Sequence, residues 1–80
     1  MNQTAKKLEE LSIMKVEITE DFLTAKISDG REVSIPIAWF PRLMNALPDQ
    51  LSNYEISPSG YGIHWPDLDE DISIKSFIYP

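Results

Sequence analysis

Hydrophobic and polar residues alternate along three consecutive stretches between Met14 and Ile37. Side chains of a strand point alternately to its two faces, so each stretch predicts a strand with one buried face. The predicted buried positions are Met14, Val16 and Ile18, then Leu23, Ala25 and Ile27, then Val33, Ile35 and Ile37. Together the three stretches predict an antiparallel meander.

Turn residues separate these stretches. Glu20-Asp21 joins the first two. Asp29-Gly30 joins the second and third, and predicts a two-residue hairpin loop because such tight turns need positive φ angles. Pro36 has no N–H for a ladder, so the third strand ends there or lies at a sheet edge.

A helical pattern follows the meander. Its apolar positions are spaced i, i+3, i+4 and i+7, which predicts one helix with a single buried face. These positions are Phe40, Leu43, Met44 and Leu47. Pro41 suits a first helical turn, and Pro48 ends this helix and opens a second turn. Trp39 and Phe40 are predicted to anchor the core at the strand-to-helix corner, with ligand stacking as the alternative.

The C-terminal part predicts a second hairpin and a closing element. Residues 54–56 form its first strand, and a turn precedes the alternating, buried Tyr61, Ile63 and Trp65. Ser73 is a candidate N-cap for a closing helix over 74–78. A final strand is the alternative there, because Ile72, Ile74 and Ser76 also alternate.

The first thirteen residues predict a short helix, since Ala5, Leu8 and Leu11 are spaced by three. A helix of this length does not persist alone, so it docks on the domain, docks on a second copy to form a homodimer, or frays. We therefore divide the chain into an N-terminal helical extension, 1–13, and one α+β domain, 14–80.

The composition is that of an ordinary globular domain, with 80 residues of which 42% are hydrophobic. The absence of cysteine excludes disulfides and sulfur-based zinc sites, and agrees with a cytoplasmic location. No apolar run approaches the ~20 residues that a membrane-spanning helix needs, and the N-terminus does not resemble a signal peptide.

The net charge of −6 is concentrated in one segment, where Asp67, Asp69, Glu70 and Asp71 supply four of the thirteen acidic residues. No basic stripe is present, so direct nucleic-acid binding is not expected. Exposed aromatic residues beside carboxylates suit a basic protein partner. The candidate binding residues are His64, Trp65, Asp67, Asp69, Glu70, Asp71, Trp39 and Arg42.

The acidic segment also allows two other interpretations. A calcium-binding hand is excluded, because Ile72 and Ile78 occupy the places of its glycine and its last glutamate. A looser metal site, or a hydrolytic site with a histidine–aspartate base, remains as the alternative and would use His64 with the carboxylates. Alternatively the acids are a solvated turn, cap backbone N–H groups, or bind Arg31 or Arg42. No catalytic nucleophile and no cofactor are predicted, so an enzyme is disfavoured.

Three separated motifs carry a resemblance to a known family. They are Asp29-Gly30-Arg31 with Ile35-Pro36-Ile37, then Trp39-Phe40-Pro41-Arg42-Leu43, then Gly62-Ile63-His64-Trp65-Pro66 leading into Leu68-Asp69-Glu70-Asp71-Ile72-Ser73. From Met14 to Ile78 the chain resembles the small bacterial family called domain of unknown function 2442. The resemblance implies a compact α+β domain without established catalytic residues. Many members are encoded beside another small protein, which implies an antitoxin-like protein–protein interaction module.

Overall fold

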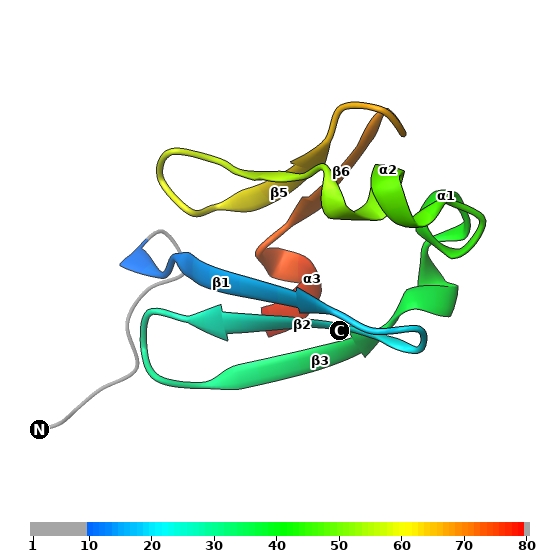
Figure 1. The fold of residues 1–80 in the computed structure, drawn as a ribbon. Coiled ribbons are helices and arrows are strands. Elements are labelled where there is room, and N and C mark those ends of the chain that lie inside the picture. The colour runs from blue at the N-terminus through cyan, green and yellow to red at the C-terminus, as the bar shows by residue number, and fades with distance from the viewer. Residues whose placement is uncertain (1–9, 80) are drawn as a thin grey trace, which may run out of the picture.

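The computed structural model describes residues 10–79, which form two three-stranded antiparallel sheets and several short helices (Figure 1). This arrangement confirms the predicted α+β class. The first sheet has the order β1-β2-β3, with β1 at Ile13–Ile18, β2 at Phe22–Ile27 and β3 at Glu32–Pro36. The second has the order β4-β5-β6, with β4 at Glu55–Ile56, β5 at Gly62–Trp65 and β6 at Glu70–Ser73.

Helical segments connect the sheets and close the chain. Between the sheets in sequence come the 3₁₀ turn η2 at Ile37–Trp39, α1 at Pro41–Met44 and α2 at Pro48–Ser52, and α3 at Lys75–Ile78 follows β6. Figure 1 shows α3 beside the strands of the first sheet and below those of the second. None of the helices described is long and apolar enough to span a membrane.

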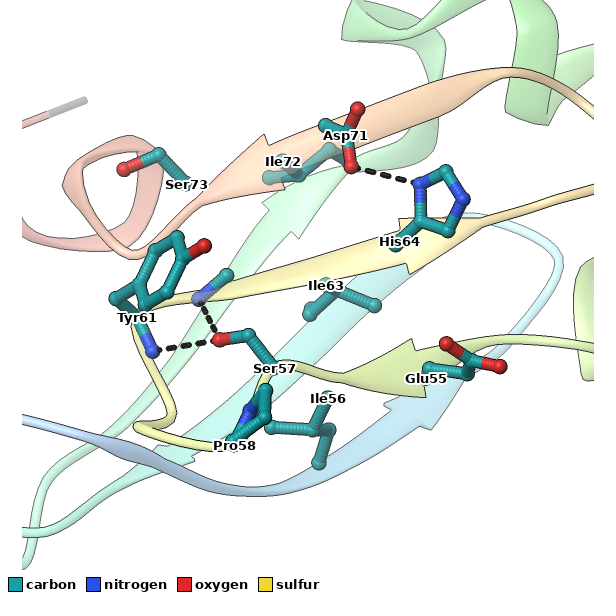
Figure 2. Close-up of a pocket in the computed structure, with 11 residues that line it drawn as sticks. Glu55, Ile56, Ser57, Pro58, Tyr61, Ile63, His64, Asp71, Ile72 and Ser73 are labelled. Carbon is teal, nitrogen blue, oxygen red and sulfur yellow. Dashed lines mark hydrogen bonds and ion pairs between the residues drawn. The ribbon is translucent and has the colours of Figure 1, made fainter.

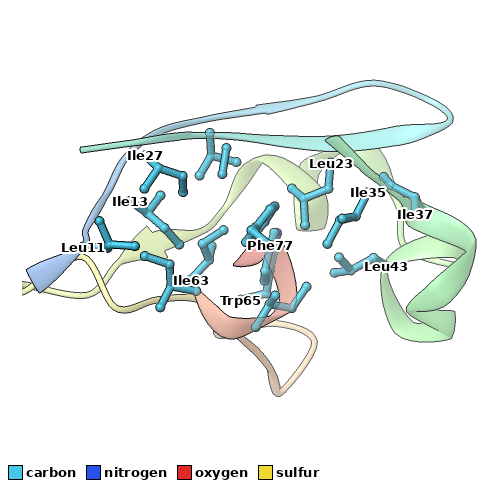
Figure 3. Packing of buried hydrophobic residues seen from close by; sticks show 14 residues of the cluster. Leu11, Ile13, Leu23, Ile27, Ile35, Ile37, Leu43, Ile63, Trp65 and Phe77 are labelled. Atoms are coloured by element: carbon cyan, nitrogen blue, oxygen red, sulfur yellow. The ribbon is translucent and has the colours of Figure 1, made fainter. Parts of the chain in front are cut away.

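One hydrophobic core is shared by the two sheets (Figure 3). The first sheet contributes one face of its meander, the second contributes Ile63, Trp65 and Ile72, and α3 contributes Phe77. Leu23 and Trp65, one from each sheet, are both 0% exposed. Burial of these side chains from both sheets is the main force that holds the two layers together.

The first sheet is the predicted meander with one correction. Leu23, Ala25 and Ile27 are buried as predicted. Met14, predicted to be buried, is 64% exposed, and Ile13 takes the core position instead. The reason is a register shift between Ile13 and Lys15, since one extra residue in a strand moves the preceding side chains to the opposite face.

The hairpin between β2 and β3 was correctly located, but its loop is longer than predicted. The amide of Gly30 donates to the carbonyl of Ile27 at 2.9 Å. The amide of Ile27 donates to the carbonyl of Arg31, also at 2.9 Å. Only Gly30 has a positive φ, of 99°, whereas a two-residue loop with Asp29 would need positive φ at both positions. The loop therefore has three residues, 28–30. Pro36 ends β3 at a sheet edge, as expected.

The predicted helix over 40–47 is shorter than expected and occupies only α1, Pro41–Met44, whereas the second turn predicted at Pro48 is present as α2. Leu47 precedes Pro48 and has extended angles, φ −74° and ψ 153°, since proline disfavours helical geometry in the residue before it. Leu43 is buried, but Met44 and Leu47 are 52% and 65% exposed. Trp39, predicted as a core anchor, is 54% exposed in η2.

The second sheet contains a strand, β6, that extends into the acidic segment. Ile63 and Trp65 are buried as predicted, but Tyr61 is 63% exposed because it lies in the turn before β5. After β6 the chain turns into α3, where Ser73 Oγ accepts the amide of Lys75 at 3.1 Å. A closing helix is therefore present, and a strand precedes it.

Most of the predicted N-terminal helix lies outside the described residues. Ile13, placed at the end of that helix, is the first residue of β1. Leu11 is 5% exposed and belongs to the core of its own chain. At Leu11 the extension therefore packs on its own domain, which was the first of the three alternatives.

A seam joins the start of β1 to the turn before β5; we define it as Ser12 and Ile13 against Ser59 and Gly60. The amide of Ile13 donates to the carbonyl of Gly60 at 2.6 Å, and Ser12 Oγ donates to the carbonyl of Ser59 at 3.1 Å. Gly60 has φ 74°, and a Cβ there would lie 2.7 Å from the Cβ of Ser12. Only glycine satisfies both the angle and the close contact.

Candidate functional site

The acidic segment is the loop and second strand of a tight hairpin. Trp65 pairs with Glu70 across the strands, and the amide of Leu68 donates to the carbonyl of Trp65 at 3.2 Å. Asp69 adopts φ 50°, a left-handed conformation that aspartate tolerates better than most residues. The sequence therefore makes a tight turn here, and the turn places several carboxylates at one end of the second sheet.

The helical segment holds this turn from the side. An Nη of Arg42 donates to the backbone carbonyl of Asp69 and lies 3.9 Å from a carboxylate oxygen of Glu70. Asn53 Nδ2 donates to Asp67 Oδ2 at 2.9 Å. The prediction that Arg42 binds the acidic segment is consistent with this geometry, and the carboxylates of Asp67 and Glu70 are partly engaged within the chain.

Arg31, the other predicted partner of the acids, is engaged elsewhere. Its guanidinium binds Asp29 Oδ2 through two nitrogens, at 2.9 Å and 2.6 Å, within the hairpin loop of the first sheet. Hydrogen bonds from Arg31 lower the pKa of Asp29, and the same pair raises the pKa of Arg31. Arg31 thus has a local structural role.

His64 and Asp71 face each other on the outer side of the second sheet (Figure 2). His64 Nδ1 lies 2.7 Å from Asp71 Oδ1, within hydrogen-bond distance. Glu55 is the cross-strand neighbour of His64 on its other side. A row of one histidine between two carboxylates therefore crosses the three strands, with side chains of His64 and Asp71 43% and 75% exposed.

This row borders a shallow depression on the outer face, but it is poorly equipped for nucleophilic chemistry. Ser57 lines the depression, and its Oγ accepts hydrogen bonds from the amides of Tyr61 and Gly62 at 3.0 Å and 3.1 Å (Figure 2). These hydrogen bonds stabilise the turn between β4 and β5. Across residues 10–79, no three histidine, aspartate or glutamate side chains are placed so that they could hold a metal ion, and this includes the row at His64. Of the four acids considered with His64, only Asp71 contacts it.

Trp65 is fully buried, so it is not a contact residue for a ligand. Its indole Nε1 donates to the carbonyl of Leu51 at 2.9 Å, and its ring lies 6.0 Å from that of Tyr54. It ties α2 to β5 and belongs to the core. The other candidates, His64, Trp39, Arg42 and the four acids, all retain exposed surface.

The comparisons with known proteins identify a family and agree with the fold. A family model described as Protein of unknown function (DUF2442) matches residues 13–80, from the first residue of β1 onward. The chain belongs to this family. No curated protein matches the sequence.

Two solved structures of uncharacterised proteins have the same fold as this DUF2442 chain. A crystal structure of a protein of unknown function from Rhodospirillum rubrum is 28% identical, with a TM-score of 0.70, and the match covers 86% of each chain. A solution structure of an uncharacterised protein from Chromobacterium violaceum is also 28% identical, with a TM-score of 0.67, over 84% of this chain. This DUF2442 chain spans 63% of the length of the Chromobacterium protein.

Sequence reasoning missed two features of the surface. Met44 was assigned to the core, yet it is exposed two residues after Arg42. Glu55 was not singled out, although its place in β4 sets it opposite His64. Pro48 was the available signal for the first feature, because it limits the length of the preceding helix. The second needs the register between two strands, for which the sequence carries no signal.

Proposed function

We propose that this protein is a protein-binding module that contacts a basic partner through an acidic corner. The acidic corner comprises the carboxylates of the β5–β6 hairpin and the exposed side chains of the helical segment that holds it. Its members are Asp67, Asp69, Glu70, Asp71, Trp39, Arg42 and Met44. The observation that carries the proposal is the contact of Arg42 with the acidic turn. Trp39 and Met44, which flank Arg42 in sequence, are both more than half exposed.

The charge of the second sheet supports a basic partner. Residues 55–73 contain five acidic residues and no lysine or arginine, in a chain whose net charge is −6. A one-signed patch of this kind steers an oppositely charged partner during encounter and disfavours acidic ones.

The apolar members support a specific contact. Trp39 and Met44 are 54% and 52% exposed and flank Arg42 in sequence. Tryptophan, methionine and arginine are all enriched in protein interfaces, and tryptophan and arginine often supply most of the binding energy. Charge then provides steering, and the apolar side chains provide affinity.

The DUF2442 resemblance supports a further step, in which the partner is a small basic protein encoded beside this one and the pair acts in an antitoxin-like manner. Both proteins would then act in the cytoplasm. In this proposal Arg42 holds the acidic hairpin in a position that the partner recognises. Its side chain also remains 58% exposed and so can contact the partner.

Co-purification from the native host tests the proposal with two matched variants. Trp39→Ala removes the exposed aromatic ring of the acidic corner. Phe22→Ala removes an aromatic ring from the first sheet, at a residue that is 47% exposed. We expect one basic protein to be recovered with the wild type and with Phe22→Ala. Its affinity for Trp39→Ala should be at least about tenfold lower. Recovery of no partner, or equal loss in both variants, would contradict the proposal.

A further inference from the structure

The free edge of β6 presents main-chain hydrogen-bonding groups. Within residues 10–79, β6 pairs with β5 on one side and has no strand on the other. In antiparallel pairs, hydrogen-bonded and non-hydrogen-bonded positions alternate. Because the amide of Ile74 donates to the carbonyl of Tyr61 at 2.7 Å, Ser73 and Asp71 fall at non-hydrogen-bonded positions. The N–H and C=O groups of Ser73 and Asp71 therefore point away from β5.

The opposite side of β5 supports this assignment. Gly62 is the cross-strand partner of Ser73. The carbonyl of Gly62 accepts the amide of Ser57 at 3.0 Å, and its own amide donates to Ser57 Oγ at 3.1 Å, both toward β4. Since the two members of a non-hydrogen-bonded pair point in opposite directions, Ser73 points outward.

The edges of the first sheet are less suitable for an added strand. The edge of β1 is occupied at Ile13 by the carbonyl of Gly60 and at Val16 by the hydroxyl of Tyr54, at 3.4 Å. On β3, Pro36 takes an outward position without an N–H, a common protection of edge strands. Among the described strands of more than two residues, β6 is thus the edge with neither a covering segment nor a proline.

We propose that β6 accepts an extended basic segment of the partner as a fourth strand of the second sheet. This inference rests on the proposed function and specifies how the partner is bound. Main-chain bonds to Asp71 and Ser73 would provide affinity, and the carboxylate of Asp71, whose side chain is 75% exposed, would pair with a lysine or arginine of the added strand. A second copy of this chain is a poorer occupant, because it carries the same carboxylates and the same net charge.

A short synthetic peptide of alternating lysine and valine is the probe. We expect saturating peptide to slow hydrogen exchange of the Asp71 and Ser73 amides at least about tenfold, measured by NMR. Two further peptides carry N-methyl groups on the amides of one edge or of the other. The peptide that is methylated on the edge facing β6 should not slow exchange of the Asp71 and Ser73 amides. Protection of neither amide, or no binding at millimolar peptide, overturns the inference.

Two proline variants provide a matched pair. Ser73→Pro removes an outward N–H that the β5–β6 ladder does not use, and Ser34→Pro makes the same change on the edge of β3. We expect peptide affinity to fall at least about tenfold in Ser73→Pro and to equal that of the wild type in Ser34→Pro. Equal affinities in both overturn the inference. If Ser73→Pro does not fold, the N-methylated peptides carry the same test.

The outcomes separate this inference from the proposed function. A host partner that is lost with Trp39→Ala but retained with Ser73→Pro supports the acidic corner and overturns the edge. A peptide that protects β6 while the host yields no partner supports the edge and contradicts the acidic corner. Self-association of the free protein that Ser73→Pro abolishes would assign the edge to a second copy, and would also overturn the inference.

Discussion

The two sheets have the same number of strands and share one core, but their charges differ. Residues 13–36 contain three basic and five acidic side chains, and lysines pair with glutamates on the exposed face. Lys15 lies 3.8 Å from Glu17, and Lys26 lies 3.7 Å from Glu32. Residues 55–73 contain five acidic side chains and no lysine or arginine.

This difference shows that two sheets with the same number of strands can differ in net charge within one small domain. The first sheet carries charges of both signs with a net charge of −2, so it offers less to steer a partner than the second sheet. The second sheet relies on Arg42, from a helical segment outside it, for the ion pair at its turn. The imbalance locates the proposed binding surface on the second sheet, whereas both sheets contribute to stability.

The largest effects are expected in the core, where two substitutions test whether the two sheets unfold together. Trp65→Ala should lower the free energy of unfolding by about 3–5 kcal/mol, and Leu23→Ala by about 2–5 kcal/mol, because each leaves a cavity in a fully buried position. The measurement is denaturant unfolding followed by circular dichroism and by NMR. A single transition is expected with both probes in both variants. Loss of the second sheet alone in Trp65→Ala would show that the sheets do not share a cooperative core.

A smaller effect is expected at the seam between the sheets. Gly60→Ala should cost about 2–3 kcal/mol, because it combines a left-handed φ with a Cβ that would lie 2.7 Å from the Cβ of Ser12. Gly30→Ala is the matched control, since its φ is also positive but no atom lies within 4 Å of the added Cβ. It should cost only about 1 kcal/mol. Equal costs in denaturant unfolding would show that the seam contributes nothing beyond backbone strain.

The smallest effect concerns the ion pair in the hairpin loop of the first sheet. Arg31 lowers the pKa of Asp29 below its ordinary value of 3.8, so the folded protein binds this proton more weakly than the unfolded chain. The pair therefore stabilises the fold above pH 3.8, and this contribution disappears as the pH falls through the lower, folded pKa. Asp29→Asn should be less stable than the wild type at neutral pH, and the difference should vanish in that acidic range. Arg31→Gln should reduce the same pH dependence without abolishing it, because the backbone amide of residue 31 still donates to Asp29 Oδ1 at 3.2 Å. A difference between wild type and Asp29→Asn that is independent of pH would contradict the assignment.

The first sheet could be predicted from sequence because its pattern is regular. Leu23, Ala25 and Ile27 repeat with period two between clear turn residues, and the structure buries all three. Met14 does not follow the alternation because β1 has a bulge there. The bulge arises in the pairing of β1 with β2, which the local pattern does not encode. The regular part of a strand is a local property, whereas its irregularities depend on the neighbouring strand.

The second sheet and the candidate site were less predictable. β6 has one buried apolar residue, Ile72, among acids and a serine, so its pattern is too short to distinguish a strand from a loop. The contacts of Arg42 with Asp69 and Glu70 join segments 27 residues apart, and sequence reasoning could only name Arg42 as one of two candidate partners. Trp65 was correctly recognised as apolar and alternating, but the same signal wrongly assigned Tyr61 to the core.

The seam has a consequence for how the chain is made. Its bond between Ser12 and Ser59 joins residues 47 positions apart, in a protein of 80 residues. While the chain is being synthesised, the meander can pair as soon as β3 emerges, yet the edge of β1 stays unprotected until Gly60 has left the ribosome. Every newly made molecule therefore passes through an interval in which the edge of β1 lacks this partner and is open to other chains.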